Sequence, residues 1–415
     1  MTDITFGPFS IDTSGSRLIR NGAEVKLRPQ AVCALKALAL HSGRYIGYEQ
    51  MIAEAWAGTS VSKHTVDVTI GEVRRALAEY GSWIAHRPKA GYALEVPKSD
   101  ELVRRGWHFW NRRTREGFER ALDCFKHAAN EGSTDFRAFL GQSTAYLSLA
   151  VYGMRPPRDM YKGFLEAHER AVSLVGLTPE LRANRAAGLH MFERRLTEAA
   201  AEFDETLRQD PGNGGTYIRM TMLYATQGRL DDALELIGRA LQVDPLMPTL
   251  AATEIVVRFW RREFDEAVAI GEKAVELHPY LQLGRAFYAQ ALEYSGRTDE
   301  ALAQYQIGSI LSPDLPWLRA LEGTCLLKKK RTTDAWTILE GLEQLRQSDY
   351  VDAYFMAGLR AALGQREEAF AELDRAVEEN SAWLYAIDVD PKMDCFKSDA
   401  RFARVREHVM GRQHL

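Results

Sequence analysis

The sequence predicts a mainly α-helical protein, with a small N-terminal α+β domain followed by an α-solenoid built from helix hairpins. Two observations predict this fold class. Short β-rich runs, punctuated by Ser-Gly and Asn-Gly pairs that suit tight turns, lie within about the first 98 residues. From about residue 103 onward the patterns are helical alone, and an alanine recurs every 34 residues.

Charge divides between the same two parts of the chain. Residues 1–98 contain 12 Lys and Arg against 9 Asp and Glu, a balance of +3, whereas the formal net charge of all 415 residues is −4. The rest of the chain therefore carries −7. Because a basic part suits a negatively charged polymer, the N-terminal part is the candidate for binding a polyanion.

Membrane and secretion segments are not expected. The longest fairly apolar run, about residues 141–154, is shorter than the roughly 20 residues that span a bilayer. The N-terminus lacks the basic start and the apolar block of a secretory signal. Four cysteines lie far apart, which fits reduced thiols in a cytosol. We therefore expect a cytoplasmic protein with no membrane partner.

The N-terminal domain is expected to span residues 1–98 and to run from strands through three helices to a hairpin. Its first helix should begin after Pro29 and end at Gly43, and its hairpin should turn at a Pro-Lys-Ala-Gly run. The predicted elements are β-rich runs at residues 4–12 and 16–27, helices at 30–43, 48–56 and 63–77, and hairpin strands within 82–97.

The third helix has one face for a core and one of mixed character. Val66, Ile70, Val73 and Leu77 recur at helical spacing and predict the buried face. A helix with basic residues opposite such a face is most often just a solvated surface. A hairpin directly after it, however, is typical of the winged form of helix-turn-helix. The opposite face carries His64, Val68, Gly71, Glu72 and Arg75.

The order of motifs in this domain resembles the OmpR/PhoB-type winged helix over nearly all of residues 4–97. The resemblance implies that the third helix enters the major groove of double-stranded DNA, while the hairpin reaches phosphates or the minor groove. The motifs that carry it are Leu27-Arg28-Pro29, Gly43-Arg44-Tyr45-Ile46, Trp56, Thr65-Val66-Asp67-Val68-Thr69-Ile70, Val73-Arg74-Arg75-Ala76-Leu77 and Gly91-Tyr92.

Carried over by position, the resemblance implies a set of DNA-binding residues. Hydroxyl, indole and cationic groups donate to phosphate, and Arg can also pair with guanine. Trp56 has packing of the second helix as an alternative role, and His64 has simple exposure. The set consists of Trp56, Lys63, His64, Thr65, Thr69, Arg74, Arg75, Arg87 and Lys89.

The third helix departs from the family pattern at Thr69, Gly71 and Glu72, where many relatives have His or Arg. These positions put direct reading of base edges by this helix in question. For Glu72 two hypotheses stand side by side. The carboxylate can accept from a cytosine amine, or it can repel DNA that is bound loosely.

The helical part repeats with a period of 34 residues, and its small residues, turns and closing prolines resemble the tetratricopeptide repeat (TPR) over residues 103–380, about eight helix pairs. A small residue is needed where the two helices of a hairpin approach most closely. Two looser copies begin at Ala121 and Ala167. Gly228, Gly296 and Gly364 stand where hairpins must turn. The leading alanines are Ala199, Ala233, Ala267, Ala301, Ala335 and Ala369.

Such an array curls so that the first helix of each pair lines an inner wall suited to peptides or partner helices. Packing between repeats is the alternative explanation for aromatic residues on this wall. Residues 381–415 are expected to form a C-terminal capping helix and tail, with Phe402, Val405 and Val409 on one face. The candidate partner-binding groove consists of Met222, Phe259, Trp260, Gln290, Tyr294 and Tyr354.

Catalytic signatures are missing from the sequence. It contains no phosphate-binding G-x-x-x-x-G-K-[ST], no H-E-x-x-H, no paired C-x-x-C and no G-x-S-x-G. We therefore predict no enzyme, no cofactor and no metal site.

The fusion of the two parts resembles soluble bacterial regulators of the HilA type. It implies a cytoplasmic DNA-binding transcriptional regulator whose repeats supply homodimerisation, effector sensing or contact with a partner protein. In the winged-helix family the loop before the third helix can touch RNA polymerase. Here that loop, residues 57–62, is short and uncharged, so activation and repression both stay open. The alternative is an interaction scaffold in which the winged helix binds protein rather than DNA.

Overall fold

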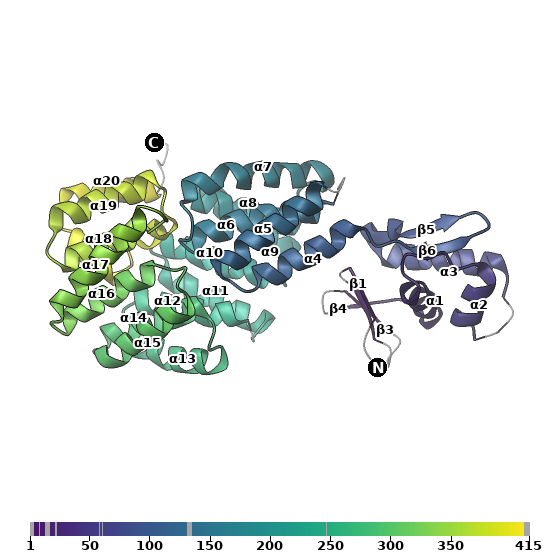
Figure 1. Ribbon diagram of the computed structural model, residues 1–415, viewed down its shortest axis with the longest axis horizontal. Coiled ribbons are helices and arrows are strands. Elements are labelled where there is room, and N and C mark those ends of the chain that lie inside the picture. Colours follow the sequence, from purple (N-terminus) through teal and green to yellow (C-terminus); the bar gives the residue numbers. More distant parts are fainter. Residues whose placement is uncertain are drawn as a thin grey trace. The chain divides into compact units, whose positions relative to one another are not determined.

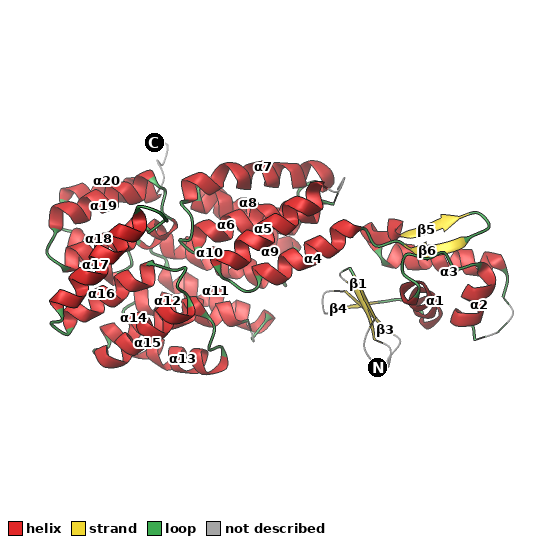
Figure 2. Cartoon of the chain, viewed as in Figure 1, coloured by secondary structure: helices red, strands yellow, loops and turns green. Residues whose placement is uncertain are grey.

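The computed structural model separates into two compact units (Figure 1). The N-terminal unit contains residues up to 105 together with 127–133, and the repeat unit contains residues 106–126 and those from 134 onward. Helices dominate the chain, and strands occur in the N-terminal unit (Figure 2). The structure describes residues 4–7, 9–12, 17–20, 23–57, 59, 61–130, 135–245 and 247–410.

The N-terminal unit has the predicted order of strands, three helices and a hairpin. β1 to β4 form an antiparallel sheet in sequence order, and β5 and β6 form a separate hairpin. The elements are β1 (Ile4–Phe6), β2 (Phe9–Asp12), β3 (Arg17–Arg20), β4 (Ala23–Val25), α1 (Pro29–Leu40), α2 (Tyr48–Ala55), α3 (Lys63–Ala76), the 3-10 helix η1 (Ala78–Trp83), β5 (Ile84–Arg87) and β6 (Gly91–Leu94).

The core of this unit confirms the spacing argument for α3. Val66, Ile70, Val73 and Leu77 are all 0% exposed, and α3 packs against both α1 and α2. At roughly 25 cal/mol per Å² of apolar surface, four such side chains fix which face of α3 points to solvent.

Gly91 ties the hairpin to the segment between α1 and α2. Its φ is +94°, and an added Cβ would lie 2.0 Å from the carbonyl oxygen of Ile46. The next residue, Tyr92, exchanges two backbone hydrogen bonds with Ile46, of 2.8 and 3.1 Å. Only glycine allows this approach of the two backbones, which explains the Gly-Tyr pair of the motif.

The repeat unit is an array of helix hairpins, as the period predicts. The six leading alanines, from Ala199 to Ala369, are all 0% exposed. Its elements, with α4 shared between the units, are α4 (Lys98–Trp110), α5 (Arg115–Asn130), α6 (Phe136–Val151), α7 (Pro157–Val175), α8 (Pro179–Met191), α9 (Leu196–Gln209), α10 (Gly214–Thr226), α11 (Leu230–Val243), α12 (Pro248–Trp260), α13 (Phe264–Leu277), α14 (Gln282–Tyr294), α15 (Thr298–Leu311), α16 (Trp317–Lys328), α17 (Thr332–Arg346), α18 (Ala353–Ala362), α19 (Arg366–Glu378), η2 (Ala382–Ala386), η3 (Pro391–Phe396) and α20 (Ala400–Met410).

The turn inside each hairpin from α8 to α19 contains one residue in the left-handed backbone region. The three predicted glycines are among them, and the other positions hold a cationic residue. A left-handed conformation costs about 1–2 kcal/mol for a residue with a Cβ and nothing comparable for glycine. With their φ angles, the six residues are Arg194 (57°), Gly228 (71°), Arg262 (68°), Gly296 (86°), Lys330 (58°) and Gly364 (84°).

Two of these cationic residues hold the first part of the C-terminal segment, which the sequence assigned to a cap and tail. Arg194 donates to the carbonyl oxygen of Ser381 at 2.9 Å. Arg262 donates to the carbonyl oxygen of Val389 at 2.7 Å and to the carboxylate of Asp394 at 2.9 Å. These contacts explain why arginine replaces glycine at two turns.

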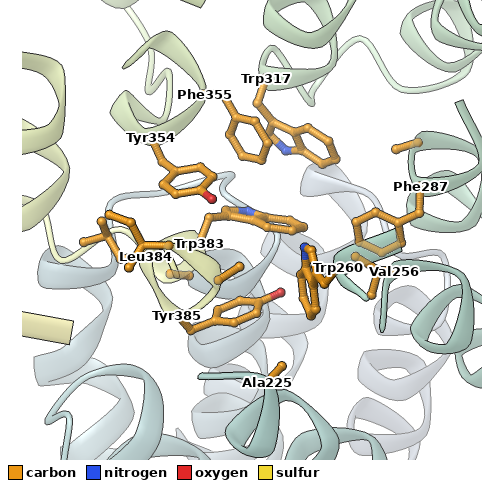
Figure 3. Packing of buried hydrophobic residues seen from close by; sticks show 14 of the residues in the cluster. Ala225, Val256, Trp260, Phe287, Trp317, Tyr354, Phe355, Trp383, Leu384 and Tyr385 are labelled. Atoms are coloured by element: carbon orange, nitrogen blue, oxygen red, sulfur yellow. The ribbon is translucent and has the colours of Figure 1, made fainter. Parts of the chain in front are cut away.

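The segment so held, residues 381–396, is named the inner segment because it lies against the inner helices of the array. The ring centroid of Trp383 is 5.4 Å from that of Trp317 and 5.1 Å from that of Phe355, and the centroid of Tyr385 is 5.8 Å from that of Trp260 (Figure 3). The expected capping helix is present as α20, which packs on α19. The inner segment differs from that expectation because its aromatic side chains are buried against the inner wall instead.

The turn residues provide a first prediction. We expect Lys330→Gly to raise the free energy of unfolding by about 0.5–1 kcal/mol, because Lys330 is exposed and left-handed and glycine removes that cost. Gly296→Ala is the matched opposite change, because nothing lies within 4 Å of the added Cβ. It should lower stability by about 1 kcal/mol. Urea denaturation followed by circular dichroism measures both, and equal signs would contradict the argument.

Two neighbouring acidic residues, buried Asp352 and half-buried Glu379, provide a second prediction. Burial raises the pKa of Asp352 to about 6, and burial, with the charge of Asp352 second, raises the pKa of Glu379 to about 7. A carboxyl group whose pKa is raised by folding costs stability above that pKa, and the cost fades as the pH falls through it. We expect Glu379→Gln to stabilise by about 1–2 kcal/mol at pH 8, allowing for partial exposure.

That gain should shrink steadily when urea midpoints of Glu379→Gln and the parent protein are compared at pH 8, 7, 6 and 5. Comparing the two proteins at each pH cancels the titration of all other groups. A difference independent of pH would show that Glu379 titrates as it does in the unfolded chain.

Candidate nucleic-acid interface

The solvent face of α3 carries several of the sequence-predicted residues. Lys63, His64, Thr65 and Arg75 are exposed. The Lys63 ammonium lies 5.4 Å from the ring centroid of Tyr48, and Arg75 makes one hydrogen bond, of 3.3 Å, to the carbonyl oxygen of Gly71 in its own helix. Because these side chains are exposed, their ends can reach a ligand at the cost of no more than weak local contacts.

The first turn of α3 is closed by Ser62. Its hydroxyl accepts from the backbone N–H of Thr65 at 3.2 Å, and the two hydroxyl oxygens of Ser62 and Thr65 are 2.9 Å apart. A capped helix N-terminus carries a partial positive charge that favours phosphate. Thr65 thus stands at a suitable place for a phosphate, while its hydroxyl also serves the cap.

Two of the predicted contacts are buried instead. Thr69 is 4% exposed, and its hydroxyl donates to the carbonyl oxygen of Thr65 at 2.8 Å. Trp56 is 9% exposed and belongs to the core of the unit. Thr69 is buried because it lies beside Ile70 on the core-facing side of α3. Trp56 performs the packing role that the sequence left as its alternative.

The neighbouring arginines of α3 have different surroundings. The Arg74 guanidinium donates to the carbonyl oxygen of Ile84 at 2.7 Å and lies 5.7 Å from the ring centroid of Tyr92. It therefore joins α3 to both strands of the hairpin. Arg75 contacts only its own helix and points outward, so only Arg75 is free to bind.

The hairpin turn presents two more cations. Arg87 and Lys89 are exposed, and Lys89 has a φ of +71° at the tip. The guanidinium carbon of Arg87 lies 4.5 Å from the ring centroid of Tyr45, which restricts the side chain at its base.

Asp67 fixes the hairpin to α2 and α3. One carboxylate oxygen accepts from the hydroxyls of Tyr48 and Tyr92, each at 2.7 Å. Burial works against the charged form, but the Tyr92 and Tyr48 hydroxyls outweigh it and lower the pKa of Asp67. The carboxylate therefore stays charged near neutral pH and sets the angle between α3 and the hairpin.

Glu72 is held by an arginine from the start of α1. Arg28 donates through Nε to both carboxylate oxygens, at 2.7 and 2.9 Å, and this bonding lowers the pKa of Glu72. Part of the negative charge on the solvent face of α3 is thus neutralised within the protein. The two hypotheses for Glu72, pairing with cytosine or repulsion, stay predictions.

The cations of α3 and the hairpin lack carboxylate partners among the described residues. No ion pair joins Lys63, Arg75, Arg87 or Lys89 to an Asp or Glu there. Arginines of the repeat unit commonly have such partners, for example the pair Arg185–Glu193. Positive charge therefore remains uncompensated on one helix face and one hairpin tip of the N-terminal unit.

Val68 is a surface residue that the predicted contact set omitted. It is 48% exposed in the middle of α3. An apolar side chain at such a place can contact a thymine methyl group in a major groove. The signal was present in the sequence, because Val68 is a valine outside the spacing of the core face.

The predicted groove of the repeat unit is largely covered by the chain itself. Gln290 accepts from the Lys392 ammonium at 2.7 Å, and Tyr354 donates to Asp390 at 2.9 Å. Trp260 packs on Tyr385 of the inner segment. In this conformation these side chains serve intramolecular contacts.

The remaining groove residues divide between packing and a cavity. The rings of Phe259 and Tyr294 meet edge to face at 5.2 Å, between two repeats. Met222 lines an interior cavity together with Ile218, Ala252 and Val256. Those four are inner-wall positions of the repeat register. Within the loop before α3, residues 58 and 60 lie outside the described part of the chain.

Comparison with known proteins agrees with this division of the chain. Residues 22–94 match the family described as "Transcriptional regulatory protein, C terminal", and residues 192–252 match "Tetratricopeptide repeat". The chain thus carries an OmpR/PhoB-type winged helix and TPR repeats. No helix in the described ranges has the length and hydropathy needed to cross a membrane.

The curated relatives share the winged-helix part. The transcriptional activator CadC of Escherichia coli is 31% identical over 98 residues, 23% of this chain and 19% of the relative. The transcriptional regulatory protein KdpE of Mycobacterium tuberculosis is 30% identical over 92 residues, 21% of this chain and 41% of that protein. The match thus spans less than half the length of either relative.

Among solved structures, that of a human IFIT1 dimer with PPP-AAAA is similar to this chain. The alignment covers 91% of this chain and 90% of the IFIT1 chain, with a TM-score of 0.53 and 15% identity. At this identity the likeness shows the helical-repeat fold alone.

The two arginines of α3 provide a third prediction. We expect Arg74→Ala to destabilise the winged-helix unit by about 1 kcal/mol, because it removes the bond to Ile84 and the contact with Tyr92. Arg75→Ala should change stability by less than about 0.5 kcal/mol. Hydrogen exchange of the hairpin amides, read by mass spectrometry, should accelerate in the first variant only. Equal exchange in both would show that Arg74 does not hold the hairpin.

Proposed function

We propose that the chain is a DNA-binding transcriptional regulator whose winged helix binds promoter DNA through α3 and the hairpin. The proposal assigns Lys63, His64, Thr65 and Arg75 of α3 to the groove and its phosphates. Arg87 and Lys89 of the hairpin are assigned to the backbone or the minor groove beside it. The match to a transcriptional regulatory domain and the likeness to an activator, CadC, support regulation of transcription.

The observation that carries the proposal is the uncompensated positive charge on α3 and the hairpin. Within the described ranges, neither Arg75 nor Lys89 forms an ion pair with a carboxylate. The nearest acidic influence on Arg75 is the charge of Glu72, which Arg28 already binds. Phosphate neutralisation and counterion release supply most of the affinity of such surfaces for DNA. The capped N-terminus of α3 adds a second phosphate site.

We assign to the TPR unit the sensing or contact role of the regulator, through dimerisation, an effector or a partner protein. A homodimer would read two half-sites about one helical turn of DNA apart. RNA polymerase stays a candidate partner of the loop before α3. The proposal places the protein in the cytoplasm and gives it no catalytic step.

A fourth prediction tests the DNA interface. Fluorescence titration of genomic fragments at several salt concentrations should show affinity that falls steeply as salt rises. We expect Arg75→Ala and Lys89→Ala each to lower affinity by about 3- to 30-fold, because each removes a phosphate or base contact. Loss of Lys89 should also reduce the slope against log salt by about 1.

Lys26→Ala is the matched control, because Lys26 is an exposed lysine that follows β4 and lies outside α3 and the hairpin. The affinity of this variant for DNA should stay within about twofold of that of the parent protein. If the parent protein shows no salt-dependent binding to any fragment, the scaffold alternative, in which the winged helix binds protein, replaces this proposal. If both interface variants bind normally, DNA is read by another surface.

A further inference from the structure

The repeat unit encloses a cavity of about 860 Å³. That volume lies within the ~300–1,000 Å³ typical of small-molecule pockets. Its wall includes Val256 of α12 and Phe287 of α14, and Trp383 and Tyr385 of the inner segment complete it (Figure 3). Because the inner segment forms part of the wall, the shape of the cavity depends on where that segment lies.

The lining is mainly apolar, but it includes polar side chains such as Thr253 and Gln282 and a group of arginines to which Arg112 also belongs. Arg113 and Arg219 both line the cavity, and the lining contains neither Asp nor Glu. Among the described residues, neither guanidinium has a carboxylate partner. Both arginines are half-buried. Because removing a cation from water without an opposite charge is costly, such a site favours an anionic ligand.

The two guanidinium groups act on each other. Burial, with the positive charge of Arg113 second, lowers the pKa of Arg219 to about 10. Arg113 is held near its place by the indole of Trp110, whose ring centroid is 3.6 Å from the guanidinium carbon. An anion between the two arginines would relieve their repulsion and the cost of burial together.

The rim of the cavity is apolar. Leu277 and Tyr280 also line it, yet they are 71% and 81% exposed. Exposed large apolar side chains beside a pocket favour a ligand with an apolar body. The wall thus combines a group of cations with a largely apolar surface.

We propose that this cavity binds a small organic anion with an apolar body, its acidic group paired with Arg219 and Arg113. The inference deepens the proposed regulatory function, because it gives the TPR unit an effector of stated chemistry. Binding is measured on the protein alone, so a failure to bind DNA and a failure to bind this ligand are separate results.

The test uses two fluorescent probes that differ by one group. Anilinonaphthalene sulfonate carries an anionic sulfonate on an aromatic body, and N-phenylnaphthylamine has the same body without the sulfonate. Titrations of the full chain should show that the anionic probe binds about 10-fold more tightly than the neutral one. Equal affinities would overturn the proposal without any variant.

Two variants locate the charge effect. Arg219→Gln should abolish the preference for the anionic probe and leave the neutral probe unchanged. Arg208→Gln is the matched control, because Arg208 is an exposed arginine on α9, paired with Glu205 and outside the cavity lining. It should bind both probes as the parent protein does. An equal loss in both variants would show a general charge effect and overturn the assignment.

A third variant locates the apolar body. Ile218→Trp replaces a half-buried aliphatic side chain of the lining with a larger indole ring. It should therefore weaken the binding of both probes by about 10-fold or more. Unchanged binding would place the probes on the outer apolar surface and overturn the proposal. Circular dichroism of each variant confirms the fold, and the comparison of probes on the parent protein stands if a variant fails to fold.

Discussion

The repeat unit depends on the close approach of paired helices at small residues. A single helix hairpin cannot bury its apolar face, so stability comes from stacking on its neighbours. Six alanines at one period are fully buried, which lets each pair of helices come close. Everything else in this unit, from the curvature of the inner wall to the cavity, requires that repeated contact.

The turns inside the hairpins connect the repeat to its interior. Glycine serves three of them at no conformational cost, whereas Arg194 and Arg262 accept a left-handed backbone and donate to the inner segment. Each arginine gives up roughly 1–2 kcal/mol of backbone energy for bonds that glycine cannot make. The inner segment and its aromatic side chains are therefore held by positions that would otherwise be simple turns.

The winged helix separates structural from binding residues within one short helix. Arg74, Asp67 and Thr69 are engaged with the hairpin, with tyrosines or with the helix backbone. Arg75 and Lys63 lie one or a few residues away and face solvent. These contacts hold α3 and the hairpin rigidly beside exposed cations. Such an arrangement suits a surface that must present several charges at fixed spacing.

The sequence by itself determined the two parts, the three helices and hairpin, the repeat period and the buried face of α3. Local periodicity and turn chemistry carry that information, because each repeat and each helix contacts its near neighbours. Tertiary structure alone decided that Trp56 is buried, that Arg28 pairs with Glu72, and that residues 381–396 cover the predicted groove. Each of these outcomes depends on residues that are far apart in the sequence and close in space. Helical spacing within one segment therefore cannot show them.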